Sequence, residues 1–267
     1  MLQGGPNSGR AGHRQVKFAR LVDCFDASAG RCASADELGR LLGDAVRELG
    51  FDYFALLHHA SLRQPASGFI RLDNYPGGWA AELGSADLAG DDPVHLASGR
   101  TNVGFAWARL GALLPLTARH RWILACSARH GLGEGFTVPA NVPGEPRGSC
   151  SFAVRKGRTL PARNLLGAEL IGAHAFRAAR RLHDYPAQGA RPHLSRRELE
   201  CLRLVAGGKS DGDIATILGL SAETVHQYVK RARAAYDVVS RTQLVVHGLR
   251  DAWISFDEAI PPNGGIG

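Results

Sequence analysis

The sequence contains no long apolar stretch. No run approaches the roughly 18 consecutive apolar residues that a membrane-spanning helix requires, so we expect no contact with a membrane. The opening segment, MLQGGPNSGRAGHRQ, has no apolar centre. This argues against a secretory signal and predicts a flexible N-terminus over residues 1–14.

Cysteine is scarce as well. The five cysteines are odd in number, and no two have the C-x-x-C spacing of zinc or redox sites: Cys24, Cys32, Cys126, Cys150 and Cys201. We therefore expect neither a disulfide framework nor a metal site, and we expect the reducing cytoplasm as the compartment. The sequence also lacks G-x-S-x-G, H-E-x-x-H, P-loop and dinucleotide-binding motifs, which disfavours an enzyme.

Positive charge is not concentrated in the C-terminal part of the chain, where it would indicate nucleic-acid binding. The whole chain has a formal net charge of +7, but residues 194–254 contain nine lysines or arginines against seven acidic residues, a net charge of only +2. Net charge is therefore weak evidence for nucleic-acid binding. Any such conclusion must depend on the pattern of the helices.

Proline and glycine mark a boundary along the chain. Residues 184–193 contain two prolines and a glycine, which is typical of a linker. Before this linker, residues 15–183 mix helical and strand periodicities, and Ser34 with Glu37 predicts a capping box for a helix over 34–49. The other predicted elements are strands at 51–59, 67–73, 135–140 and 148–156 and helices at 117–130 and 162–182. This α+β pattern predicts an N-terminal α/β/α sandwich of the kind that senses small molecules.

Residues 194–256 show only helical signals, which predicts an all-α domain of four helices. A serine suited to capping precedes each predicted helix: Ser195, Ser210, Ser221 and Ser240. A tight turn at Gly219-Leu220 joins the short second helix to a longer third one, which is the order of a helix-turn-helix. The last predicted helix spans 241–254, and the tail over 257–267 is predicted to be flexible.

The outer face of the third of these helices is polar and basic. It presents Thr224, His226, Gln227, Lys230, Arg231 and Arg233. Such side chains can bond base edges and phosphates in a major groove. The alternative is a plain four-helix bundle with a solvated basic face, and helical spacing alone favours this alternative.

Two short motifs in this domain change that balance. Glu198, Leu202, Gly208 and Lys209 form one motif, and Ser221, Thr224 and Val225 form the other. At this spacing they resemble the DNA-binding domain of LuxR-type regulators. The resemblance covers about 60 residues and implies binding of double-stranded promoter DNA as a homodimer in the nucleoid, with RNA polymerase as a further possible partner.

A second set of motifs lies in the N-terminal domain. Asn74-Tyr75-Pro76-Gly77-Gly78-Trp79 is followed by Asp92-Pro93, then Trp107, Gly135-Phe136-Thr137-Val138-Pro139 and Gly148-Ser149-Cys150-Ser151-Phe152. These segments resemble the autoinducer-binding domain of quorum-sensing LuxR proteins. The resemblance implies a small-molecule signal, an N-acyl homoserine lactone, rather than a cofactor.

The resemblance also implies a role for each matched residue. Trp79 would donate to the lactone carbonyl, Asp92 would accept from the ligand amide, and Trp107 would pack on the lactone ring. Tyr75 and Ser151 would donate to the acyl carbonyl, and Tyr53 on the first strand is a further candidate. Leu83 stands where the family has a tyrosine, which removes a hydroxyl and an aromatic wall from the pocket. Taken singly, most of these residues could instead be core aromatics, turn residues or strand hydroxyls.

Three alternatives remain open at this point. The first is an orphan LuxR-type regulator that senses another molecule or needs none, which Leu83 favours. The second is an enzyme, because 11 histidines and five cysteines could form a Cys-His site; however, His58 and His59 on one predicted strand would face opposite sides. The third is an adaptor that no longer binds DNA, which the basic face of the third helix disfavours.

Overall fold

The computed structural model describes residues 8–59, 70–79, 82, 88–143, 145–183 and 191–260. The chain forms two compact units: the first contains residues 1–142 and 146–185, and the second contains residues 186–267 together with the short segment 143–145. Each unit has its own hydrophobic core. None of the helices in these residues is long and apolar enough to cross a membrane.

The first unit is built on one antiparallel sheet with the strand order β2-β1-β5-β4-β3. The strands are β1 (Tyr53–His58), β2 (Arg71–Asp73), β3 (Phe105–Ala106), β4 (Leu132–Ala140) and β5 (Gly148–Arg155). Every residue of β5 except Arg155 is buried, so helices must cover both faces of the sheet.

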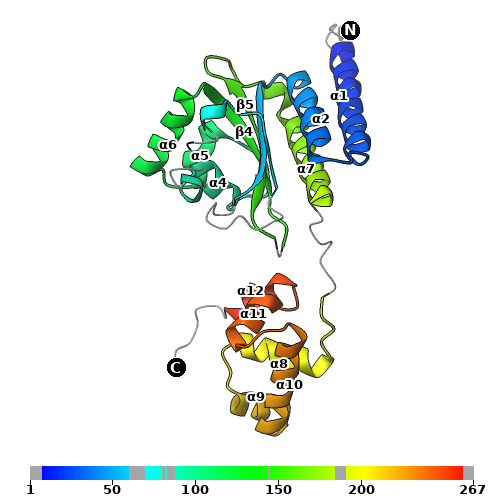
Figure 1. The fold of residues 1–267 in the computed structure, drawn as a ribbon, viewed down its shortest axis with the longest axis vertical. Coiled ribbons are helices and arrows are strands. Elements are labelled where there is room, and N and C mark those ends of the chain that lie inside the picture. The colour runs from blue at the N-terminus through cyan, green and yellow to red at the C-terminus, as the bar shows by residue number, and fades with distance from the viewer. Residues whose placement is uncertain are drawn as a thin grey trace, which may run out of the picture. The chain divides into compact units, whose positions relative to one another are not determined.

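One face of the sheet is covered by α2 (Ala35–Glu48) and α7 (Leu165–Leu182), and α1 (Ser8–Ala29) packs on the outer side of these two helices (Figure 1). Alternate strand residues such as Phe54, Leu56 and Phe152 enter this main core, as the period of two requires. Phe18 of α1 lies on Gly167 of α7, where a Cβ atom would overlap its ring.

The opposite face is covered by shorter helices (Figure 1). They are the 3-10 helices η1 (Leu88–Gly90) and η2 (Trp107–Arg109) and the α-helices α4 (Pro93–Ser98), α5 (Leu110–Leu113) and α6 (Ala118–Arg129). Thr117 caps α6 and Gly131 follows its end at φ +89°, as predicted. The arrangement confirms the expected three layers of helix, sheet and helix.

The N-terminal segment differs from the prediction. Helix α1 begins at Ser8, whereas residues 1–14 were expected to be flexible. The first residues of α1 are polar. Farther along the helix, Val22, Phe25 and Ala29 are spaced so that one side of α1 is buried in the main core. Packing against the rest of the unit therefore stabilises a helix that local signals do not predict.

Other boundaries shift by a few residues. The second strand covers 71–73, and residues 67–69 of its predicted range lie outside the described residues. Strand β4 begins at Leu132, three residues before the predicted start. Ser34 caps α2 as expected, but the Glu37 carboxylate accepts from the backbone N–H of Ala33 instead of completing the capping box at Ser34.

The second unit confirms the helical prediction. Its main helices are α8 (Arg196–Ala206), α9 (Asp211–Leu218), α10 (Ala222–Ala235) and α11 (Arg241–Arg250). The predicted serine caps are present at all four. Leu202, Ile214, Val225 and Leu244 are fully buried in the core of this unit.

The end of the second unit corrects the prediction. The last predicted helix stops at Arg250 instead of residue 254, because Ala252 adopts a positive φ of 55°. A further short helix, α12 (Phe256–Ala259), then occupies the start of the tail that was expected to be flexible. Ser255 and Glu258 cap this helix reciprocally, and Glu258 also pairs with Arg203 of α8 at 3.2 Å.

Candidate functional site

A buried polar chain crosses the sheet face that α4 to α6 cover. The indole Nε1–H of Trp107 donates to Thr137 Oγ1 at 2.9 Å, and Thr137 Oγ1 is 2.8 Å from Ser151 Oγ. Thr137 and Ser151 are directly opposed on β4 and β5, so their side chains lie side by side. The chain thus joins two predicted signal-binding residues through Thr137, a fully buried residue that sequence reasoning did not select.

Gly135 explains how Trp107 reaches this chain. A Cβ atom at Gly135 would overlap the indole ring of Trp107, so the ring lies directly on the backbone of β4. Gly135 and Thr137 are two residues apart and share one face of the strand. The Gly-x-Thr spacing in the sequence was therefore an available signal for this contact.

Tyr75 extends the polar chain beyond Ser151. Burial raises the pKa of the Tyr75 hydroxyl, the nearby Asp92 carboxylate adds to this, and a hydrogen bond with Ser151 opposes it. Tyr75 also meets the ring of Tyr53 edge-on at 6.4 Å between centroids. The hydroxyl therefore stays protonated at neutral pH and can donate a hydrogen bond.

Trp79 closes one end of this face. It is buried in an apolar cluster with Leu88, Ile123, Cys126 and Leu132, and both Tyr75 and Trp107 pack against the same cluster. Because Leu132 begins β4 opposite Arg155, Trp79 marks the end of the face near the carboxyl end of β5.

Asp92 has a structural role in addition to its predicted one. It is buried, and its Oδ1 accepts from the backbone N–H of Val94 at 2.8 Å, capping α4 ahead of Pro93. Its second oxygen, Oδ2, lies 3.9 Å from Nε2 of His95. One carboxylate oxygen thus fixes the helix, and the other is directed to a different partner.

The structure therefore brings six of the seven predicted signal-binding residues to one face of the sheet or its edge: Tyr53, Tyr75, Trp79, Asp92, Trp107 and Ser151. Leu83, the seventh, lies outside the described residues.

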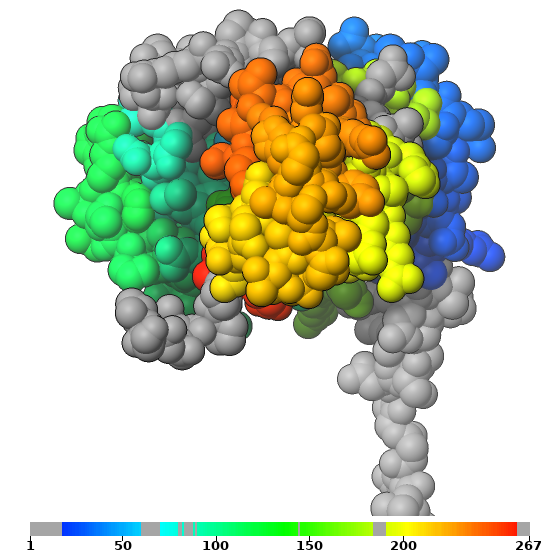
Figure 2. Space-filling model, turned by 90° about the horizontal axis from the view of Figure 1, so that it is seen from below, coloured from blue at the N-terminus to red at the C-terminus, as the bar shows by residue number. Residues whose placement is uncertain are grey.

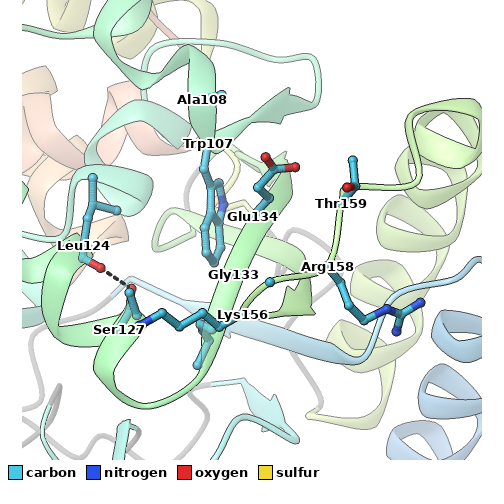
Figure 3. Close-up of a pocket in the computed structure, with 12 residues that line it drawn as sticks. Trp107, Ala108, Leu124, Ser127, Gly133, Glu134, Lys156, Arg158 and Thr159 are labelled. Carbon is cyan, nitrogen blue, oxygen red and sulfur yellow. Dashed lines mark hydrogen bonds between the residues drawn. The ribbon is translucent and has the colours of Figure 1, made fainter.

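A pocket of about 540 Å³ is lined in part by Trp107 (Figure 3). Trp107, Leu124 and Leu132 form its apolar wall, and Lys156 and Glu134 are among its polar lining residues. Of the described residues predicted to bind the signal, only Trp107 lines this pocket. The Trp107 indole is therefore the residue that the pocket and the polar chain share.

A helix-turn-helix forms the second candidate site. Helices α9 and α10 are joined by Gly219, Leu220 and Ser221, and Gly219 adopts the left-handed conformation at φ +65° that ends α9. Figure 2 shows the second unit (yellow to orange) from the end at which α9 lies. His226, Gln227, Lys230 and Arg231 are exposed on α10, Lys209 is exposed before α9, and Thr224 is half-buried.

Asp211 holds the start of α9 against two other elements. Its carboxylate accepts from Arg241 at 2.6 Å and lies 3.5 Å from His226 on α10. Gln227 similarly bonds Glu223 at 2.8 Å. Within the described part of the chain, Lys230 and Arg231 form no such bond, so their cationic groups are available to phosphates or bases.

Arg233 does not belong to this surface, contrary to the prediction. It is half-buried, and its guanidinium donates to the backbone oxygen of Val239 at 2.6 Å. This bond ties the end of α10 to the loop before α11. Helical spacing placed Arg233 near the basic face, but it could not show that the neighbouring loop folds back over it.

No group of three metal-ligating side chains occurs among the residues that the structure covers. His58 packs edge-on against Phe176 of α7, whereas His59 stacks on His95 of α4. The two neighbouring histidines therefore face opposite sides of the sheet, as their spacing predicted.

Two family models match the chain. The autoinducer binding domain matches residues 34–179, and the bacterial regulatory proteins of the luxR family match residues 192–247. The protein belongs to the LuxR family. It is a quorum-sensing transcriptional regulator with an autoinducer-binding domain and a DNA-binding helix-turn-helix.

The similar proteins are regulators as well. The chain is 29% identical to the HTH-type transcriptional regulator y4qH of Sinorhizobium fredii, with 88% of this chain and 72% of the relative covered. It is 25% identical to the regulatory protein SdiA of Escherichia coli, with 81% and 90% covered. The crystal structure of Escherichia coli SdiA has the same fold, with a TM-score of 0.64 at 23% identity and 89% and 99% covered.

The family membership decides among the alternatives. LuxR-family relatives are transcriptional regulators, so the chain is not an enzyme. The autoinducer-binding domain favours a small-molecule signal over the orphan alternative, and the luxR-type helix-turn-helix favours DNA binding over an adaptor role.

Proposed function

We propose that the first unit binds an N-acyl homoserine lactone on the sheet face between Trp79 and Ser151, and that the ligand-bound protein binds promoter DNA as a homodimer in the cytoplasm. The buried polar chain Trp107–Thr137–Ser151, with Tyr75 and Asp92 beside it, is the observation that supports this most directly. A small amphiphile needs such an arrangement: an apolar surrounding with a few fixed donors and acceptors.

The polar groups match the two ends of an acylated lactone. Asp92 would accept from the ligand amide through Oδ2, since Oδ1 already caps α4. Tyr75 and Ser151 would donate to the acyl carbonyl. Trp79 would donate to the lactone carbonyl, with Trp107 packed against the ring. A charge-assisted bond to a buried carboxylate discriminates strongly against ligands that lack the amide N–H.

Dimerisation would use the exposed side of α7. Leu166 and Leu170 lie one helical turn apart and are 69% and 42% exposed. Two helix-turn-helix units held in this way can reach successive major grooves of a palindromic site, about one helical turn apart. Lys230 and Arg231 would contact the DNA, and a promoter-bound dimer can then meet RNA polymerase. Leu166→Glu with Leu170→Glu should produce a monomer in light scattering.

The first test is a thermal-shift screen of the full-length protein against acyl homoserine lactones of varied chain length. A stabilising shift with one subset is expected, because a ligand that binds only the folded state adds its binding free energy to stability. Absence of a shift for every lactone, in protein that still binds DNA, would refute the proposed ligand class.

A matched variant tests the role of Asp92. Asp92→Asn keeps an oxygen that can cap α4 but removes the charge. A hydrogen bond to a charged group is worth about 1.5–3 kcal/mol, so lactone affinity should fall roughly 10- to 100-fold while helix α4 is retained. Unchanged affinity would remove Asp92 from the ligand site.

A further inference from the structure

A second polar cluster lies on the same sheet face as Ser151, nearer the start of β5. His59 Nε2 is 2.9 Å from Ser149 Oγ, and the His59 ring stacks on His95 of α4 with centroids 4.2 Å apart and planes 15° apart. We call His59, His95 and Ser149 the distal cluster.

The register of the sheet fixes where this cluster lies. Ser149 shares a face with Ser151, two residues along β5, and pairs with Leu57 and Pro139 on the neighbouring strands. Two residues span roughly 7 Å of strand. Trp79 lies toward the opposite end of the same face, near Leu132. A ligand whose lactone contacts Trp79 and whose carbonyl contacts Ser151 therefore has its acyl chain directed toward Ser149.

A connection through His95 gives the same direction. Asp92 Oδ2 lies 3.9 Å from Nε2 of His95, and His95 in turn stacks on His59. The acceptor proposed for the ligand amide and the distal cluster are thus consecutive along one edge of the site. An acyl chain that leaves Asp92 would therefore pass the two imidazole rings. A plain alkyl chain would usually be surrounded by apolar side chains instead.

The cluster has unused hydrogen-bonding capacity. Burial, followed by the charges of His95, His58 and Arg147, holds the pKa of His59 well below its usual value, so its imidazole is neutral. Its Nδ1 is buried and has no hydrogen-bond partner among the described residues. The Ser149 hydroxyl, which is also buried, can form more bonds than the one it makes to His59.

We infer that the distal cluster selects signals whose acyl chain has a hydroxyl or carbonyl oxygen far from the amide, in preference to plain alkyl chains. This inference depends on the proposed function, because it assigns the outer end of the same ligand site. A plain alkyl chain would cover the His59 and Ser149 polar groups without bonding them, which costs free energy. An oxygen at this position would bond His59 or Ser149 instead.

The test compares matched lactones on the full-length protein by titration of tryptophan fluorescence. The two lactones of each pair have acyl chains of equal length, and only one of them has a hydroxyl at the end of the chain far from the amide. A third lactone of the same length has its extra oxygen close to the amide. We expect the far hydroxyl to improve affinity about tenfold over the plain chain, which corresponds to about 1.4 kcal/mol. The oxygen beside the amide should give no such gain, since it lies short of Ser149.

Variants assign the preference to the cluster. His59→Leu should abolish or invert the preference for the far hydroxyl, and Ser149→Ala, which removes only one oxygen, should reduce it. His193→Leu, at an exposed residue of the second unit, should leave it unchanged. Circular dichroism of each variant separates loss of preference from loss of folding, and Ser149→Ala keeps the test valid if His59→Leu fails to fold.

The outcomes separate the two proposals. If the plain and hydroxylated lactones bind wild-type protein equally well, the inference is wrong and the proposed function stands. A preference that survives both His59→Leu and Ser149→Ala overturns the inference in the same way. If no lactone binds, both proposals are overturned.

Discussion

Replacing Thr137 with valine would test whether the buried polar chain stabilises the first unit. Thr137 Oγ1 accepts the Trp107 indole N–H at 2.9 Å and bonds Ser151 at 2.8 Å, and Thr137 is fully buried. Valine has nearly the same shape but no oxygen, so the indole N–H loses its acceptor. Ser151 retains Tyr75 as a partner.

The expected cost follows from that difference. An unsatisfied buried donor costs about 1–3 kcal/mol, and since Trp107 is only half-buried we expect about 1–2 kcal/mol. For a unit of this size, each kcal/mol lowers Tm by about 2–4 °C, which gives a decrease of about 2–8 °C. Differential scanning calorimetry of Thr137→Val measures the decrease, and Thr159→Val, at an exposed threonine, is the control.

A Thr137→Val protein as stable as wild type would refute this reasoning. It would mean that water or a rearranged Trp107 satisfies the indole N–H, and that the hydroxyl of Thr137 has no structural role.

Three further perturbations test other parts of the molecule. Gly135→Ala should displace Trp107, because a Cβ overlaps the ring, and a change in tryptophan emission without ligand would reveal this; an unchanged spectrum would contradict the contact. Lys230→Ala should weaken operator binding and lower the salt slope by about 1, whereas Arg233→Ala should mainly destabilise the second unit, since Arg233 bonds Val239. The hydrogen bond with His130 lowers the pKa of Glu82 below its usual 4.5. This bond therefore stabilises the folded protein fully above pH 4.5, and the stabilisation is lost as the pH falls through the lower pKa of the folded state. Thermal melts of Glu82→Gln should lack this acid-dependent loss.

Local signals predicted the second unit almost completely. Serines at Ser195, Ser210, Ser221 and Ser240 each cap a helix, and Gly219 ends α9, because caps and left-handed glycines act within a few residues of where they occur. The miss at α12 has a different cause. Ser255 and Glu258 are a local capping signal that was overlooked, and an ion pair with the distant Arg203 further holds this helix.

The first unit was predicted less completely for a physical reason. Helix α1 is stabilised by distant packing, such as that of Phe18 on Gly167, which no local pattern reveals. The residues predicted to bind the signal were selected through motif resemblance, and the closeness of Trp107 to Ser151 depends on the pairing of β4 with β5. The Gly135-x-Thr137 spacing indicated a contact with an aromatic ring, but the bond from Thr137 to Ser151 became evident only once the cross-strand pairing was known.

The serine caps have a consequence for how this protein can diversify. The start of α10 is set by Ser221, and its inner face is set by Val225 and Val229, so neither depends on the outward side chains. Lys230 and Arg231 contribute little to folding and can be exchanged while the backbone geometry is retained. If this face contacts the operator as proposed, new operator preferences are accessible by single substitutions on it. The proposed signal site has less freedom to vary, because its polar groups also hold α4 and Trp107 in place.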